Sequence, residues 1–189
     1  MTAIDYQVAA SGDDGHWYQS TFSGNGVSLQ IGGTTSRDYN IFARFTGVTI
    51  PAGATITAAY VSLHYTGAAG TPGEFPIYFE DAANPAAPTT AADANGRTKT
   101  TATINWTPPG SANWNNSPDL SSIIQELVNS YDYSSGAAMQ FLWIGAIQET
   151  TIFRQYKSYD YTGNESGPKL HIEYTEAAGG YAHSQCIII

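Results

Sequence analysis

Hydrophobic and polar residues alternate along most of this chain, and the alternation predicts β-strands. Every second side chain of a strand faces the same way, so one face can be buried while the other meets water. The pattern is clearest in residues 56–66 and 169–174, and turn-forming Gly, Asn and Pro separate the alternating stretches. Roughly ten such stretches follow one another, which predicts an all-β jelly-roll sandwich of antiparallel strands.

Residues 138–145 differ from the other strands because both of their faces are apolar. Phe141 and Trp143 face one side, while Leu142 and Ile144 face the other. A strand of this kind is covered on both sides, so we expect it near the centre of the fold.

Residues 118–129 predict one short helix. Ser117 suits the N-cap, Pro118 the first helical position and Asp119 the first turn, where the helix dipole favours an acid. The apolar residues recur with the spacing of a single helical face: Leu120, Ile123, Ile124, Leu127 and Val128. We expect this helix to cover one end of the core.

Two segments lack the alternation. Residues 81–98 are rich in Ala, Pro, Thr and Asn and predict a long surface connection, which is often functional. Residues 1–175 are predicted to form the jelly-roll body, and residues 176–189 are predicted to form a C-terminal tail. The tail ends in four residues of apolar character: Cys186, Ile187, Ile188 and Ile189. An apolar β-branched end aggregates unless it is paired, so we expect it to dock on the body or on a neighbouring subunit.

Charge excludes several classes of partner. The net charge is −9, with only seven Lys and Arg residues, so neither nucleic acid nor an anionic membrane surface is an expected ligand. The acidity suits neutral glycans or cations, or serves solubility alone. No stretch is long and apolar enough to span a membrane, and residues 1–10 lack a signal-peptide pattern. We therefore expect a chain that the ordinary secretory route does not export, although a start after a removed leader would look the same.

Motifs for catalysis are missing. The chain contains no nucleophile elbow, no phosphate-binding loop and no carboxylate pair in a telling motif. Its four histidines do not share a metal-binding spacing: His16, His64, His171 and His183. His171 alternates with the apolar residues of its strand, so we expect its side chain to face outward. A non-enzymatic protein that needs no cofactor is the prediction.

Asp13 and Asp14 lie in an early turn between Gly12 and Gly15. Turns of β-sandwiches supply oxygen ligands to calcium, so these carboxylates are candidates for a structural calcium site. The alternative is that each Asp side chain stabilises the turn by binding its own backbone.

Aromatic residues in polar loops are candidates for glycan binding, because rings stack on sugar faces and Tyr adds a hydroxyl. The candidates are Trp114, Tyr131, Tyr133 and Tyr159, with Trp17, Tyr156 and Tyr161 as further possibilities. The alternative is core packing, which we expect for Trp106 and Trp143 because they lie in alternating apolar stretches.

Several segments, in this order along the chain, resemble DNRLRE-type modules, which are jelly-roll domains grouped with carbohydrate-binding modules. They are Phe42–Phe45, Val48–Ala59, Trp106–Thr107 with Trp114, Ser117–Leu120, Ser134–Ala138, Ser158–Asp160 and Pro168–Tyr174. Tyr133 stands where relatives carry Trp.

The resemblance implies two functions, because such modules occur in phage structural proteins and in secreted polysaccharide-active proteins. The first is a display protein on the virion surface, of the capsid-decoration or head-fibre type. It would be held by other protein subunits, including copies of itself. The alternative is an extracellular glycan-binding module, which would bind a cell-surface or polysaccharide glycan.

Overall fold

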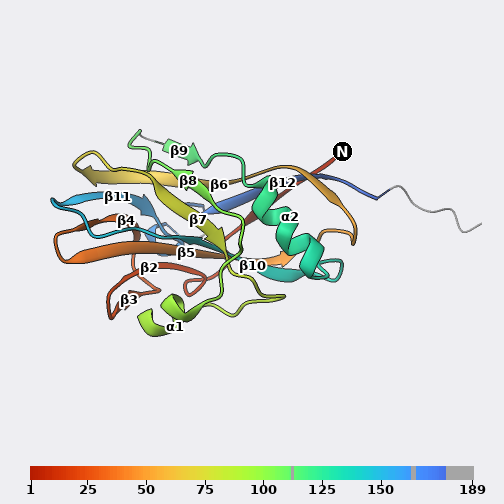
Figure 1. Ribbon diagram of the computed structural model, residues 1–189, viewed down its shortest axis with the longest axis horizontal. Coiled ribbons are helices and arrows are strands. Elements are labelled where there is room, and N and C mark those ends of the chain that lie inside the picture. Colours follow the sequence, from red (N-terminus) through yellow and green to blue (C-terminus); the bar gives the residue numbers. More distant parts are fainter. Residues whose placement is uncertain (112, 163–164, 178–189) are drawn as a thin grey trace, which may run out of the picture.

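The computed structural model describes residues 1–111, 113–162 and 165–177. Within these residues, twelve antiparallel strands form one strongly curled open sheet, and two short helices pack against it (Figure 1). The chain is therefore mostly β, as predicted, with more strands than the roughly ten expected and a second helix. The strands are Thr2–Gln7 (β1), Asp14–Tyr18 (β2), Thr21–Ser23 (β3), Ser28–Thr34 (β4), Arg37–Val48 (β5), Thr55–Ala69 (β6), Phe75–Phe79 (β7), Ile104–Trp106 (β8), Asn113–Asn116 (β9), Ala137–Trp143 (β10), Ile152–Lys157 (β11) and Lys169–Thr175 (β12). The helices are Ala91–Gly96 (α1) and Ser121–Ser130 (α2), and Tyr159–Tyr161 (η1) forms a 3₁₀ turn.

The strand order brings the two ends of the body together. Along the sheet the strands follow the order β1-β12-β6-β11-β4-β5-β10-β7-β8, with β2 beside β5, β3 beside β2, and β9 beside β6. The first strand thus pairs with the last, and Tyr6 lies opposite Leu170. Because the sheet curls, the inward side chains of its two halves meet in one hydrophobic core.

Strand β10 is an interior strand of the sheet and is covered on both faces, as its apolar faces predict. It pairs with β5 on one side and β7 on the other. Trp143 points into the main core, where its ring stacks on Trp106 with centroids 4.3 Å apart. Leu142 points outward into a second cluster, together with Trp17 and Phe42. The core positions expected for Trp106 and Trp143 are confirmed.

The connection over residues 81–98 contains helix α1, which the sequence interpretation missed. Ala91 and Ala94 are buried against the second cluster. The hydroxyl of Thr90 caps the helix by accepting a hydrogen bond from the backbone N–H of Asp93 at 3.0 Å. Six residues are too few to display a helical period, and small Ala side chains carry little hydrophobic signal.

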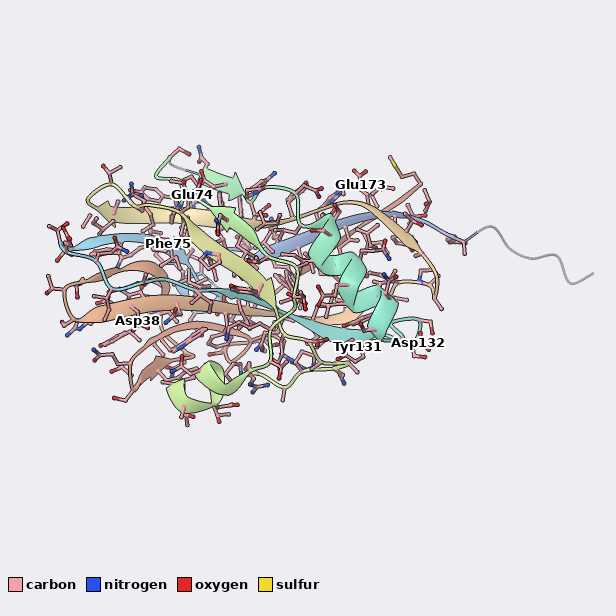
Figure 2. The ribbon with its side chains drawn as sticks, viewed as in Figure 1. Asp38, Glu74, Phe75, Tyr131, Asp132 and Glu173 are labelled. Atoms are coloured by element: carbon pink, nitrogen blue, oxygen red, sulfur yellow. The ribbon has the colours of Figure 1, made fainter. Side chains whose placement is uncertain are left out.

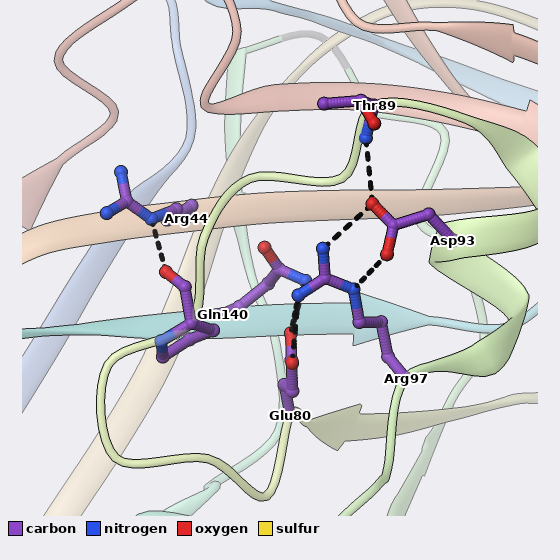
Figure 3. A network of polar contacts seen from close by, with 7 residues as sticks. Arg44, Glu80, Thr89, Asp93, Arg97 and Gln140 are labelled. Atoms are coloured by element: carbon purple, nitrogen blue, oxygen red, sulfur yellow. Dashed lines mark hydrogen bonds and ion pairs between the residues drawn. The ribbon is translucent and has the colours of Figure 1, made fainter.

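A network of charges holds this connection on the sheet (Figure 3). The Arg97 guanidinium donates to Glu80 Oε1 at 3.0 Å and to Asp93 Oδ2 at 2.9 Å. Glu80 also accepts a hydrogen bond of 2.8 Å from Gln140 in the centre of β10. On the same face, Arg44 donates to the Pro85 carbonyl at 2.7 Å. These contacts make the connection a fixed part of the fold.

Helix α2 begins at Ser121, three residues later than predicted, with Leu120 as its N-cap. Ser117 and Asp119 bind the backbone of β6: Ser117 Oγ accepts from the Val61 N–H and Asp119 Oδ1 accepts from the Ala59 N–H, both at 3.0 Å. Asp119 Oδ1 also accepts from the Ser121 N–H at the start of the helix, at 3.1 Å. The first part of β6, before Ser62, pairs with β12 on one side only, so the backbone groups on its other side need such partners, and this need decides where the helix starts. The predicted apolar face is confirmed, since its members are all buried: Leu120, Ile123, Ile124, Leu127 and Val128.

Gln125 of α2 also completes the edge of β6, so Gln125→Ala should destabilise the protein by about 1–2 kcal/mol. Its side chain accepts from the Ile56 N–H at 2.8 Å and donates to the Ala54 carbonyl at 3.2 Å. Urea unfolding measures the loss. Gln148→Ala is the matched control, because Gln148 donates only to a nearby exposed carbonyl. Equal stability of the two variants would contradict a role for Gln125 at the strand edge.

Candidate ligand-binding groove on the outer face of the sheet

Four neighbouring strands, β1, β12, β6 and β9, place polar and aromatic side chains on the outer face of the sheet. Residues opposite each other in antiparallel strands project from the same face. The register therefore produces two rows across the strands, one of Asp5, His171 and Tyr60, and one of Gln7, Lys169, Ser62 and Asn116. The inward alternates of these strands, such as Leu170 and Val61, belong to the core.

A shallow groove of about 430 Å³ lies on this face, a volume within the range of small-molecule and oligosaccharide sites. We call it the outer-face groove. Its lining consists of Asp5, Tyr6, Gln7, Tyr60, Ser62, Lys169 and His171. The groove therefore offers hydrogen-bond donors and acceptors together with aromatic surface.

His171 is the most highly connected side chain of the groove. Its ring stacks on Tyr60 with centroids 4.7 Å apart and planes 21° from parallel. Its Nδ1 lies 2.8 Å from Asp5 Oδ1, and its Nε2 lies 3.4 Å from Glu173 Oε1. Partial burial acts to lower the pKa of His171, but the hydrogen bonds to the two carboxylates outweigh it and raise the pKa above 6.5.

Trp114 of β9 lies beside the groove. The ammonium of Lys169 sits 4.2 Å from the centre of the Trp114 ring, and the ring of His64 meets it edge-on at 5.3 Å. A cation over an indole face is attracted by the ring quadrupole. Among the described residues, no carboxylate forms an ion pair with Lys169. This side of the groove thus presents a ring and a cation to a ligand.

The four aromatic residues predicted for glycan binding are not brought together. Trp114 borders the groove, whereas Tyr131 lies at the C-terminal end of α2 and donates to Asp81 Oδ1 at 2.9 Å (Figure 2). Tyr159 lies in η1, where its backbone N–H binds Asp14. Tyr133 is 1% exposed, so its ring fills the core and has no face open to a sugar. Trp17 and Tyr156 are buried as well.

Asp13 and Asp14 take separate roles. Asp13 Oδ1 forms an ion pair of 2.8 Å with Arg44 Nη1. Asp14 is 1% exposed, and its Oδ2 accepts a hydrogen bond of 2.8 Å from the Tyr159 N–H. Burial is the main cause that raises the pKa of Asp14, to about 7. In the part of the chain that the structure describes, no three acidic, His or Cys side chains are placed to hold a metal ion, so the calcium prediction gains no support.

Most residues of the groove were not singled out from the sequence. The outward orientation of His171 was predicted and is confirmed, but Tyr60, Lys169 and Asp5 were not predicted as residues of a site. The signal that could have identified these residues is the set of polar and aromatic side chains at every second position of the first and last strands. Reading that set requires knowing which strands are neighbours.

The apolar end at Cys186, Ile187, Ile188 and Ile189 lies outside the described residues, so its docking stays a prediction. Across residues 1–111, 113–162 and 165–177, no helix has the length and apolar character needed to cross a membrane.

Comparison of the sequence with models of known protein families gives no match. Comparison with curated proteins gives no match either. The resemblance to DNRLRE-type modules therefore stays a prediction that rests on the segments quoted above.

Proposed function

We propose that this protein is a non-enzymatic glycan-binding module and that the outer-face groove holds the glycan. The observation that carries the proposal is the placement of two aromatic rings, Tyr60 and Trp114, among polar side chains on one open face. A sugar ring has an apolar face that stacks on an aromatic ring and hydroxyls that need hydrogen-bond partners. Gln7, Ser62 and Lys169 supply donors and acceptors for those hydroxyls.

The shape and charge of the groove support the same class of ligand. Sites for compact apolar ligands are enclosed and lined mainly by hydrophobic groups. The outer-face groove is instead shallow and polar, and it crosses several strands, which suits an extended chain of sugars. The net charge of −9 disfavours nucleic acid as the extended ligand.

The contacts of the two carboxylates near the groove support binding without catalysis. Glycoside hydrolysis needs one carboxyl group as an acid and a second as a nucleophile or base. Asp5 and Glu173 both lie against His171, so both oxygens that face the ring are already in use. This arrangement favours recognition over bond cleavage.

We further propose that the curled sheet is a sandwich of the jelly-roll kind. Two observations support this: the first strand pairs with the last, and the two halves of the sheet meet over one core. Display of the groove on a virion surface, or in an extracellular polysaccharide-active protein, rests on the resemblance to DNRLRE-type modules. Both settings stay predictions.

A glycan array followed by calorimetry on the best ligand tests the proposal. Trp114→Ala and Tyr60→Ala should each weaken binding at least about tenfold, because each removes a stacking surface. Thermal unfolding of each variant checks that the fold is retained.

Tyr161→Ala is the matched control. Tyr161 is 45% exposed and carries its own cation, Lys157, at 4.6 Å from the ring, but it lies in η1, outside the groove. Its affinity should equal that of the unchanged protein. An array without ligands would refute the proposed function, and a loss confined to Tyr161→Ala would move the site to η1.

A further inference from the structure

His171 has a carboxylate at each of its two ring nitrogens. Nδ1 faces Asp5 of β1, and Nε2 faces Glu173, two residues further along β12. A neutral imidazole carries one N–H, so it can donate to only one carboxylate, while an imidazolium donates to both. The observed pair of contacts is therefore satisfied only when the ring carries both protons.

Loss of the proton leaves one of the two carboxylates facing a lone pair. The Asp5 contact is 2.8 Å and the Glu173 contact is 3.4 Å, so the remaining N–H stays on Nδ1 and Glu173 loses its donor. The other groups around the ring do not replace that donor. Tyr60 of β6 stacks on the ring face, and Lys169 of β12 lies over Trp114.

We propose that the proton on His171 decides whether Glu173 Oε1, which lies beside the outer-face groove against the His171 ring, is free to accept a hydrogen bond from a ligand in that groove. This inference rests on the proposed function, since the ligand is the glycan assigned to that groove. Glu173 lies on the same face as His171, near the end of β12 (Figure 2). Once released, its carboxylate is an acceptor for sugar hydroxyls, and charged acceptors form the stronger hydrogen bonds.

The direction of the effect follows from this exchange. At pH values below the pKa of His171, the imidazolium holds both carboxylates, and Glu173 Oε1 is not available to a ligand in the groove. As the pH rises through that pKa, Glu173 is released and the glycan binds more tightly. The raised pKa of His171 moves this change toward neutral pH.

NMR titration of the His171 ring tests, without any ligand, whether the imidazolium is held by both Asp5 and Glu173. Asp5→Asn and Glu173→Gln should each lower the pKa of His171, because each removes a negative partner of the imidazolium. His64 is an internal control, since it lies on the same face and, among the residues that the structure describes, no carboxylate forms an ion pair with its ring. The chemical shifts of its ring should be unchanged by either substitution. A His171 titration that neither variant changes would overturn the inference.

Calorimetry with the glycan at pH 5.5 and pH 8 tests the coupling to binding. The unchanged protein should bind at least about tenfold more tightly at pH 8, the value of one hydrogen bond to a charged group. Glu173→Gln should bind with the same affinity at both pH values. His171→Gln carries a single donor group at every pH, so it should also lose the pH dependence.

The two possible failures are distinguishable. Binding that is equally tight at both pH values overturns the role given to Glu173 and leaves the proposed function intact. Absence of binding at every pH overturns the proposed function itself.

Discussion

Arg97→Met is expected to destabilise the protein by about 3 kcal/mol, because it leaves a buried carboxylate without its cation. Glu80 is 7% exposed and lies against the Arg97 guanidinium at 3.0 Å. Without Arg97, the side-chain donor left to Glu80 is Gln140. Burial already acts to raise the pKa of Glu80, and the Arg97 contact opposes that effect. Removing Arg97 therefore leaves the desolvation cost uncompensated.

Chemical denaturation measures this loss, and two further variants show its origin. In Glu80→Gln combined with Arg97→Met, the buried charge is gone, so much of the stability should return. Arg37→Met is the matched control, because Arg37 is an exposed arginine that lies 5.0 Å from the Tyr18 ring. Its effect should stay within about 0.5 kcal/mol, as is usual for surface positions. Similar losses for Arg37→Met and Arg97→Met would contradict the role of the network in Figure 3.

Asp14→Asn is expected to remove a large pH dependence of stability. The pKa of Asp14 is about 7 in the folded protein, against an ordinary value of 3.8. Between these values the folded protein holds a proton that the unfolded chain has released. Unfolding therefore releases a proton, and stability falls as the pH rises through this window. The full difference amounts to roughly 4 kcal/mol, since one pKa unit corresponds to about 1.4 kcal/mol.

Unfolding curves between pH 4 and pH 8 check this prediction. The unchanged protein should lose stability toward pH 8, while Asp14→Asn should show a flatter profile and greater stability at pH 8. The amide oxygen of Asn can still accept the hydrogen bond from Tyr159. Asp132→Asn is the control, because hydrogen bonds from exposed Ser134 lower the pKa of Asp132, so this carboxylate stabilises the fold at higher pH. A profile that Asp14→Asn leaves unchanged would show that Asp14 is ionised in the folded protein.

Local patterns predicted much of the fold. Period-two alternation located strands such as β6 and β12, and the two apolar faces of residues 138–145 identified β10 as central. The apolar face of α2 was found because five apolar residues at the spacing of one helical face are hard to produce by chance. Helix α1 was missed because it has six residues, two of which are small buried Ala side chains.

The start of α2 shows why local signals can mislead. Ser117, Pro118 and Asp119 have the residue types of a helix N-terminus. In the structure, Ser117 and Asp119 bind the backbone of β6, a strand more than fifty positions away in the sequence. A hydroxyl or carboxylate can serve a helix or a strand edge equally well, and tertiary contacts decide between them.

The jelly-roll interpretation began from the alternation of apolar and polar residues. From such local patterns the sequence by itself determined four properties: mostly β structure, a central β10, the apolar face of α2 and the outward orientation of His171. These properties follow from the side chains of a single element. The groove was decided only by the tertiary structure, because Asp5, Tyr60 and His171 belong to three strands whose pairing no single strand specifies. The burial of Tyr133 and Asp14 was decided in the same way, since burial depends on what packs against a residue and not on the residue itself.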